Sequence, residues 1–172
     1  GYAFFAGRDA TAAYVTGEFG EEGLTDDTSA LDARQMLELT QWRDFYRDHE
    51  TYRRVGTLIG RYYDALGRPT EAMRQAEAKV AAGQAVKDDE EADRQTHPPC
   101  NSRWAQGKGG EVWCSPDSGG IKRTWTGRPR RYFQRGGEPR CACVRDEHLD
   151  DPRMKLYDGC APDATRCKVS NS

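Results

Sequence analysis

The chain begins with GYAFFAGRDATAAYVTGEF, residues 1–19, where one tyrosine and two phenylalanines precede a glycine, an arginine and an aspartate. The ends of a domain usually carry few groups that need burying. Rings at this place favour one of two interpretations: the chain is cut within a domain, or the rings face a group that is not protein. The alanine-rich residues 6–16 predict a short helix, with Asp9 in its first turn, where a carboxylate suits the positive end of the helix dipole.

A second helix is predicted from residue 29 onwards. Ser29 and Asp32 resemble the start of a capping box in which an aspartate stands in place of the usual glutamate. Apolar side chains then recur at spacings of three and four residues, which is the period of an amphipathic helix. These residues are Met36, Leu39, Trp42, Phe45 and Tyr46.

The pattern changes beyond this helix. YRRVGTLIGRYYD, residues 52–64, is rich in aromatic and β-branched residues and runs into a turn, so it predicts a strand or a hairpin arm. Thr70 then caps a long helix whose apolar stripe consists only of Met73, Ala76 and Val80. So thin a stripe does not anchor a core. The sequence therefore predicts a spacer helix, which leads through KDDEEADRQ towards the first cysteine.

The composition of the 172 residues indicates a chain with much solvated surface. Hydrophobic residues make up 36% and charged residues 31%, against roughly 45–50% and 25% in ordinary globular domains. The formal charge of −2 favours no particular charged partner. No run approaches the roughly 18 apolar residues of a membrane span, and the first residues do not form a signal peptide. We expect a fragment or mature form whose upstream segment is a signal or an anchor.

The cysteines are the strongest compositional signal, because the first 99 residues contain none. The six are Cys100, Cys114, Cys141, Cys143, Cys160 and Cys167. An even number in a polar, Gly/Pro-rich region predicts disulfides that replace a missing apolar core, and hence an oxidising compartment. Six cysteines allow 15 pairings, and spacing leaves them open, although a bond between the C-x-C neighbours is not expected. Zinc is the competing interpretation, but structural zinc favours paired C-x₂₋₄-C knuckles.

No catalytic motif is visible. His49, His97 and His148 are scattered and are expected at the surface, and the chain has no serine-hydrolase, zinc-protease or P-loop motif. The sequence therefore predicts a protein that is not an enzyme.

Residues 121–140, IKRTWTGRPRRYFQRGGEPR, hold seven basic residues and one acid, interleaved with Trp125, Tyr132 and Phe133. Such a pattern suits a nucleic acid or a glycosaminoglycan. The favoured alternative is a solvated loop whose rings fill a small core around the disulfides. Oxidised cysteines also argue against an intracellular nucleic acid partner.

Eight tyrosines without a histidine pair suggest a different kind of site. Tyrosine can ligate ferric haem as a phenolate. Because the pKa of the phenol is about 10 in water, the Fe(III) charge must stabilise the anion. An anionic ligand in turn favours ferric over ferrous iron, so such a site is a poor shuttle for electrons.

Three N-terminal stretches resemble motifs of the membrane-associated progesterone receptor family, the haem-binding relatives of cytochrome b5. They are YAFFAGRDA (2–10), DDTSALDARQMLELTQWRDFY (26–46) and TYRRVGTLIGRYY (51–63). The cysteine-rich half resembles one member of that family in four further stretches. They are PPCNSRW (98–104), VWCSPDSGGIKRTWTGRPRRYF (112–133), GEPRCACVR (137–145) and YDGCAP (157–162).

The resemblance implies an α+β fold that begins with an N-terminally truncated cytochrome b5-like haem-binding domain. A spacer helix and a disulfide-rich C-terminal extension follow it. On this basis residues 1–66 are a partial haem-binding domain, residues 67–96 the spacer helix or linker, and residues 97–172 the cysteine-rich region. The first strands of the family's sheet precede the point where the sequence begins, so we expect residues 1–65 alone to pack incompletely and to bind haem weakly or not at all.

The resemblance also implies the site residues. Tyr2 matches the family's axial ligand to the haem iron, and Tyr52 matches a second tyrosine that forms a hydrogen bond near the haem. Phe4 and Phe5 are expected to line the apolar pocket around haem b. Thr51 stands where the best-known relatives have a lysine, which removes a cation that can hold a haem propionate.

The function implied is a non-enzymatic haem-binding protein, secreted or in the endomembrane lumen, with a role in neuronal differentiation. A cell-surface or endomembrane protein is the expected partner, with no nucleic acid. Two alternatives stay open: an extracellular cysteine-rich interaction module with a vestigial haem site, and an electron-transfer partner of haem mono-oxygenases. The low potential expected of tyrosinate-ligated haem weighs against the second.

Overall fold

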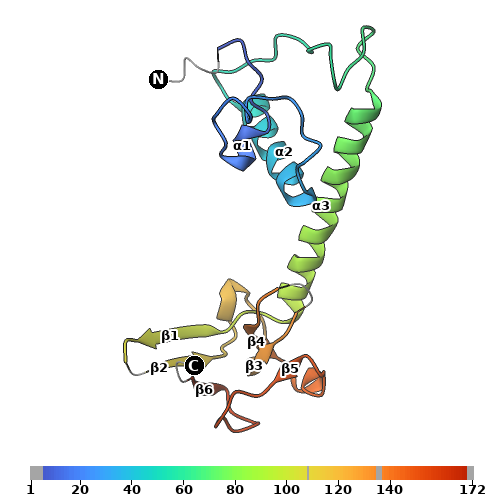
Figure 1. Cartoon of the computed structure of the whole chain (residues 1–172). Coiled ribbons are helices and arrows are strands. Elements are labelled where there is room, and N and C mark those ends of the chain that lie inside the picture. The colour runs from blue at the N-terminus through green and yellow to red at the C-terminus, as the bar shows by residue number, and fades with distance from the viewer. Residues whose placement is uncertain (1–5, 108, 135–136, 170–172) are drawn as a thin grey trace. The chain divides into compact units, whose positions relative to one another are not determined.

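The computed structural model describes residues 6–107, 109–134 and 137–169. The chain divides into two compact units, unit 1 from Gly1 to Asp89 and unit 2 from Glu90 to Ser172. Helices occur in unit 1 and two small antiparallel sheets in unit 2 (Figure 1), so the predicted α+β class is confirmed. Among the described residues, no helix combines the length and the apolar character that crossing a membrane requires.

The first helix of unit 1, α1, spans only Ala13–Thr16. The prediction of a helix over residues 6–16 is therefore wrong in its extent, because residues 6–8 and 11–12 form turns instead. Ala10 and Ala13 are buried, so small side chains let this segment pack closely. The helix ends at Gly17, whose φ of 70° is left-handed and whose N–H donates to the carbonyl of Ala13, a glycine stop signal.

The second helix, α2, spans Ala33–Asp48 and confirms the amphipathic pattern. Its N-cap is Asp32, whose carboxylate accepts from the N–H of Gln35 while the Gln35 side chain accepts from the N–H of Asp32. The capping box is therefore shifted by three residues from the predicted start at Ser29. An aspartate accepts hydrogen bonds from free helix N–H groups as well as serine does, and Gln35 supplies the reciprocal acceptor.

The third helix, α3, spans Glu71–Thr96 and continues through the charged stretch KDDEEADRQ, residues 87–95. In unit 1 it contacts the start of α2 at Gly83, the one fully buried residue of α3 among those described. Lys79 also donates from Nζ to the carbonyls of Ser29 and Leu31, at 2.6 and 2.8 Å. The close contact at Gly83 and the two hydrogen bonds of Lys79 therefore hold α3 against the start of α2, in addition to its thin apolar stripe.

The predicted strand over residues 52–64 is wrong. Residues 52–59 have no regular secondary structure, and the only pairing in this segment is an isolated bridge between Tyr63 and Pro69. Val55 and Leu58 are 94% and 75% exposed. A strand needs a neighbouring strand to satisfy its N–H and C=O groups, and none of the described residues supplies one.

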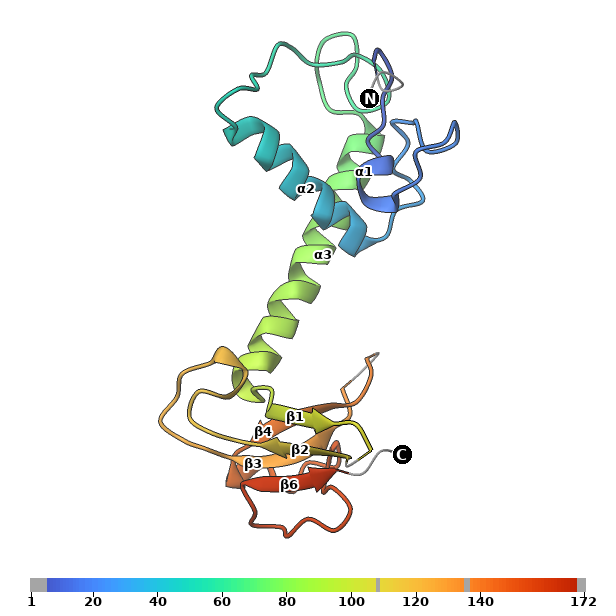
Figure 2. The ribbon, with the colours of Figure 1, turned by 90° about the vertical axis from the view of Figure 1, so that its left-hand side faces the viewer.

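Unit 2 contains two three-stranded antiparallel sheets, whose strands lie side by side in Figure 2. The first sheet has the order β1 (Asn101–Ala105), β2 (Gly109–Trp113), β6 (Arg166–Val169). The second has the order β4 (Arg140–Val144), β3 (Arg128–Tyr132), β5 (Met154–Lys155). Short 3₁₀ turns occur at Ser118–Gly120 and Asp146–His148.

The core of unit 2 lies on one face of the second sheet. Tyr132, Ala142, Val144 and Met154 pack together there, and each is at most 6% exposed. Because successive residues of a strand point to opposite faces, the cysteines that alternate with Ala142 and Val144 on β4 lie on the other face. The strand thus contributes one face to the apolar core and the other to disulfides.

The six cysteines are all paired. The bonds are Cys100–Cys141, Cys114–Cys143 and Cys160–Cys167. The C-x-C neighbours take separate partners, as predicted. A sulfur held in a disulfide is not a thiolate, so this pairing leaves no ligand set for the competing zinc interpretation.

Candidate functional site

Unit 1 has a groove beside α2, which we call the aromatic groove. It has a volume of about 480 Å³ and a predominantly apolar lining. Its main lining residues are Tyr14, Met36, Leu39, Trp42, Tyr46, Tyr62, Met73 and Val80. The helical period of α2 brings one apolar residue from each turn to this wall, and α3 supplies the opposite residues. Trp42 and Tyr46 remain 42% and 37% exposed, so the predicted apolar face of α2 lines a groove rather than a closed core.

Hydroxyl groups inside the aromatic groove are joined to one another. The Tyr14 and Tyr46 oxygens lie 3.0 Å apart, and this hydrogen bond, together with burial, raises the pKa of Tyr46. Tyr62 donates to the Asp26 carbonyl at 2.6 Å and receives the N–H of Thr28. The raised pKa favours the neutral phenol at Tyr46, and the three hydroxyl groups act as hydrogen-bonding contacts at the groove.

Tyr52, one of the predicted site residues, is not among the groove's lining residues but lies next to one of them, Tyr46. Its ring centroid is 5.1 Å from that of Tyr46 and 4.6 Å from that of His49, and the residue is 51% exposed. Phe45 extends the same aromatic wall, 5.2 Å from Tyr46. Tyr52 therefore contacts the groove through Tyr46, which is one of its lining residues.

The other three predicted site residues, Tyr2, Phe4 and Phe5, lie outside the described residues. Thr51, which stands in place of the family's lysine, is exposed and follows His49, whose Nδ1 accepts its N–H at 3.1 Å. The groove lining includes the cation Arg43, whose side chain is 66% exposed and pairs with Asp44 at 2.9 Å. The described part of the site is therefore an open, largely apolar surface whose charged lining residues are Arg43 and Glu77.

Unit 2 contains a polar cluster that the sequence did not predict. Tyr132 donates to Asp93 at 2.7 Å, and Arg140 pairs with the other oxygen of the same carboxylate at 2.9 Å. The Arg140 and Arg153 guanidiniums lie 5.1 and 5.4 Å from the centroid of the Tyr132 ring. Burial, followed by the hydrogen bond to Asp93, raises the pKa of Tyr132. The alternation of arginine and aromatic residues over 121–140 was the available signal, but it did not identify the acid.

His97 was expected at the surface, and this prediction is wrong. The residue is 6% exposed and its ring centroid lies 5.2 Å from that of Tyr132. Burial lowers the pKa of His97, because the charged imidazolium loses its hydration. Its Nδ1 is buried without a hydrogen-bond partner among the described residues. The reason is its position: the residue follows the last turn of α3 and precedes two prolines, so the chain turns inward there.

The basic segment 121–140 takes part in the packing of unit 2. Arg123 and Arg145 lie 4.6 and 4.7 Å from the centroid of the Trp125 ring, and Arg130 is only 5% exposed. Tyr132 fills the core, as the favoured interpretation held, but residues Arg128–Tyr132 form a strand and not a loop. Arg123 and Arg145 act as packing groups on an aromatic face, whereas the Arg130 guanidinium donates to the carbonyls of Pro129 and Pro162.

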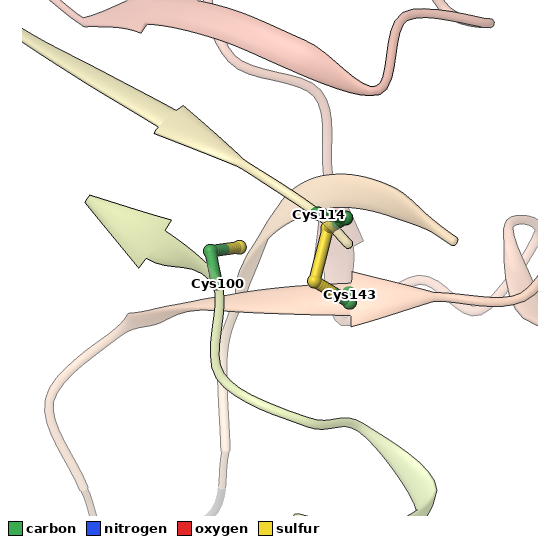
Figure 3. A group of neighbouring side chains, drawn as sticks. All are labelled: Cys100, Cys114 and Cys143. Carbon is green, nitrogen blue, oxygen red and sulfur yellow. A yellow bond between two sulfur atoms is a disulfide. The ribbon is translucent and has the colours of Figure 1, made fainter. Parts of the chain in front are cut away.

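The sulfur atoms of Cys100, Cys114 and Cys143 gather in one place. Each lies within 4.8 Å of the other two, and Figure 3 shows the Cys100 sulfur beside the Cys114–Cys143 bond. This grouping brings the first disulfide close to the second.

Comparison with known proteins connects both units to one family. Over 96% of this chain, and 69% of the relative, the sequence is 42% identical to neuferricin of Mus musculus. For neuferricin of Danio rerio the identity is 41%, over 99% of this chain and 64% of the relative. The chain belongs to the neuferricin family. The resemblance to the wider membrane-associated progesterone receptor family is thereby confirmed, and a membrane-associated progesterone-binding protein of Arabidopsis thaliana is 40% identical over 98% of this chain.

The match extends through both units, so the neuferricin family shares the cysteine-rich unit as well as the helical one. The chain spans about two thirds of the length of these neuferricins, from 64% to 69%. No family model matches the chain, and no solved structure matches it.

Proposed function

We propose that this chain is a non-enzymatic haem-binding protein, with Tyr2 as the axial ligand of ferric haem b. The observation that carries the proposal is the aromatic groove of unit 1, where the lining residue Tyr46 contacts the ring of Tyr52. The chain belongs to the neuferricin family, whose wider family implies a haem site there. Cytochrome b5-like relatives bind a planar, largely apolar macrocycle. A groove walled by Trp42, Tyr46 and Met36 offers the matching chemistry.

The described residues fit such a group in size and in polarity. The groove volume of about 480 Å³ lies within the roughly 300–1,000 Å³ typical of ligand sites. Its apolar lining suits the porphyrin faces, and the exposed rim at Arg43 suits propionates, which carry negative charge. The raised pKa of Tyr46 favours its neutral phenol, and the family resemblance makes Tyr2 the candidate for a phenolate ligand.

Haem binding through Tyr2 has a chemical consequence. A phenolate oxygen stabilises Fe(III) more than Fe(II), so the bound iron is expected to have a low reduction potential. Storage, transport or sensing of ferric haem suits such a site better than electron transfer does. We propose a secreted or lumenal location, because all six cysteines are paired and disulfides persist in oxidising compartments.

Titration of the full 172-residue chain with haemin tests the proposal. The expected result is a saturable Soret absorption, with weak affinity because the exposed Trp42 and Tyr46 leave the groove open. The ligand-to-metal band of tyrosinate-ligated iron should disappear in Tyr2→Phe, and Tyr52→Phe should weaken binding less. Tyr157→Phe in unit 2 is the matched control and should behave like the parent. A chain that takes up no haemin, or an unchanged spectrum in Tyr2→Phe, would refute the proposal.

A second candidate role, a protein-interaction module, belongs to unit 2. The observation that favours it is that residues Glu90–Ser172 form a compact unit with three disulfides. On this alternative the haem site is vestigial. Binding of the full chain to a cell surface that persists in Tyr2→Phe and is lost on disulfide reduction favours the module. Loss of that binding in Tyr2→Phe favours the haem proposal.

A further inference from the structure

Four cysteines of unit 2 form a compact array between the two sheets. Cys100 directly precedes β1 and Cys114 directly follows β2, and these ends of the two antiparallel strands are paired. The two cysteines therefore lie just beyond the end of the same ladder. Cys141 and Cys143 alternate on β4 and face the same side of that strand. Two disulfides consequently lie next to each other, each joining the first sheet to β4.

The two disulfides differ in access to solvent. Cys100 and Cys141 are partly exposed, whereas Cys114 and Cys143 are 6% and 0% exposed. The Cys100–Cys141 bond is therefore the more accessible of the two to a reductant in solution. The Cys100 sulfur lies within 4.8 Å of both inner sulfurs (Figure 3), whereas Cys141 does not belong to this close group.

We propose that these disulfides form a thiol–disulfide exchange site, in which Cys100 transfers reduction from the outer bond to the inner one. A dithiol reductant gives two electrons and two protons to the Cys100–Cys141 bond, yielding two thiols, and is itself oxidised to a disulfide. The Cys100 thiolate then attacks one sulfur of Cys114–Cys143. A new sulfur–sulfur bond forms to Cys100, the old inner bond breaks, and the released sulfur leaves as a thiolate that takes up a proton.

The exchange changes how the two sheets are linked. Attack on Cys143 leaves a Cys100–Cys143 bond, which still joins the first sheet to β4. Attack on Cys114 leaves a Cys100–Cys114 bond within the first sheet, and β4 then loses its covalent link to that sheet. The inner disulfide is thus responsive to a dithiol partner that never reaches it directly, because the outer bond supplies the attacking group.

Two single variants of the full chain test this inference. Cys141→Ser leaves Cys100 as a thiol beside the inner bond, and Cys100→Ser leaves Cys141 as the thiol. Each oxidised protein is incubated at about pH 8, where an ordinary thiol is partly ionised, then blocked with N-ethylmaleimide and mapped by non-reducing mass spectrometry. In Cys141→Ser we expect a bond from Cys100 to Cys114 or Cys143, with the label on the released cysteine.

The matched control, Cys100→Ser, should keep the Cys114–Cys143 bond and carry the label on Cys141. An intact inner bond with the label only on Cys100 in Cys141→Ser overturns the proposal. A near-UV circular dichroism spectrum like that of the parent reports that unit 2 has folded. If a variant loses that spectrum, the parent protein decides the matter: partial reduction with dithiothreitol should yield the same rearranged bonds, and their absence also overturns the proposal.

Discussion

Replacing Gly83 by alanine should destabilise unit 1, although alanine is the better helix former. In the interior of a helix alanine is favoured over glycine by about 1 kcal/mol. Against this gain, a Cβ at Gly83 would overlap the carbonyl oxygen of Ala33. The same Cβ would lie 2.9 Å from the carbonyl carbon of Ala33 and 3.1 Å from the Cβ of Leu37. The obstacle is backbone in the first turn of α2, so it cannot rotate aside and the two helices must separate.

Overpacking of this kind costs about 1–3 kcal/mol, and a rigid backbone obstacle places the cost in the upper part of that range. After subtraction of the helix gain, we expect a net loss of about 1–2 kcal/mol in the free energy of unfolding. Urea unfolding followed by far-UV circular dichroism measures it, because the helical signal comes mainly from unit 1.

The matched control is Ala82→Gly, one residue earlier in α3 and exposed. It should cost about 1 kcal/mol through helix propensity alone. If Gly83→Ala proves as stable as the parent or more stable, the close approach of α3 to α2 does not contribute to stability. The reasoning about how this thin helix is anchored would then be wrong.

Three further predictions concern unit 2. Tyr132→Phe removes the 2.7 Å hydrogen bond to the Asp93 carboxylate and should cost about 1.5–3 kcal/mol in urea unfolding; a loss below about 0.5 kcal/mol would contradict it. Burial lowers the pKa of His97, so its contribution to stability is fully present above the ordinary pKa of about 6.5 and is lost as the pH falls from that value through the lowered pKa of the folded state. His97→Gln should flatten the stability profile between about pH 7.5 and pH 5, and an unchanged slope would show that other groups cause it. Replacing both cysteines of Cys160–Cys167 by serine opens a loop with a sequence separation of 7. The free energy of unfolding, measured with urea, should fall by about 2.5 kcal/mol, and no measurable loss would contradict the chain-entropy argument.

Features encoded by local residue patterns were predictable from the sequence. The three- and four-residue spacing along α2 identified the helix, and an even number of cysteines in a polar region identified disulfides. The helix signal lies within one short segment, and the disulfide signal lies in the composition of the region. The exact N-cap was missed because Ser29 and Asp32 are both good capping residues, and only Gln35 distinguishes between them.

Features that depend on a distant partner were not predictable. Residues 52–59 have the composition of a strand, but a strand exists only with a neighbour, and none of the described residues supplies one. The burial of His97 depends on Tyr132, which lies 35 positions further along the chain. The Cys100–Cys141 and Cys114–Cys143 pairings likewise depend on the register of the strands and not on the spacing.

The two units are stabilised by different physical means, and this allows the two proposals to be tested separately. The buried apolar residues described in unit 1 are only Ala10, Ala12, Ala13, Leu31 and Met36, so packing alone provides little stability there. A ligand that binds the aromatic groove at a hundred times its Kd adds about 2.7 kcal/mol to the unit that holds it. Disulfides serve the same purpose in unit 2. Haemin should therefore raise the stability of the helical signal without altering the disulfide map, whereas a dithiol should alter the map without shifting the helical transition. A reversal of either effect would mean that the site has been assigned to the wrong unit.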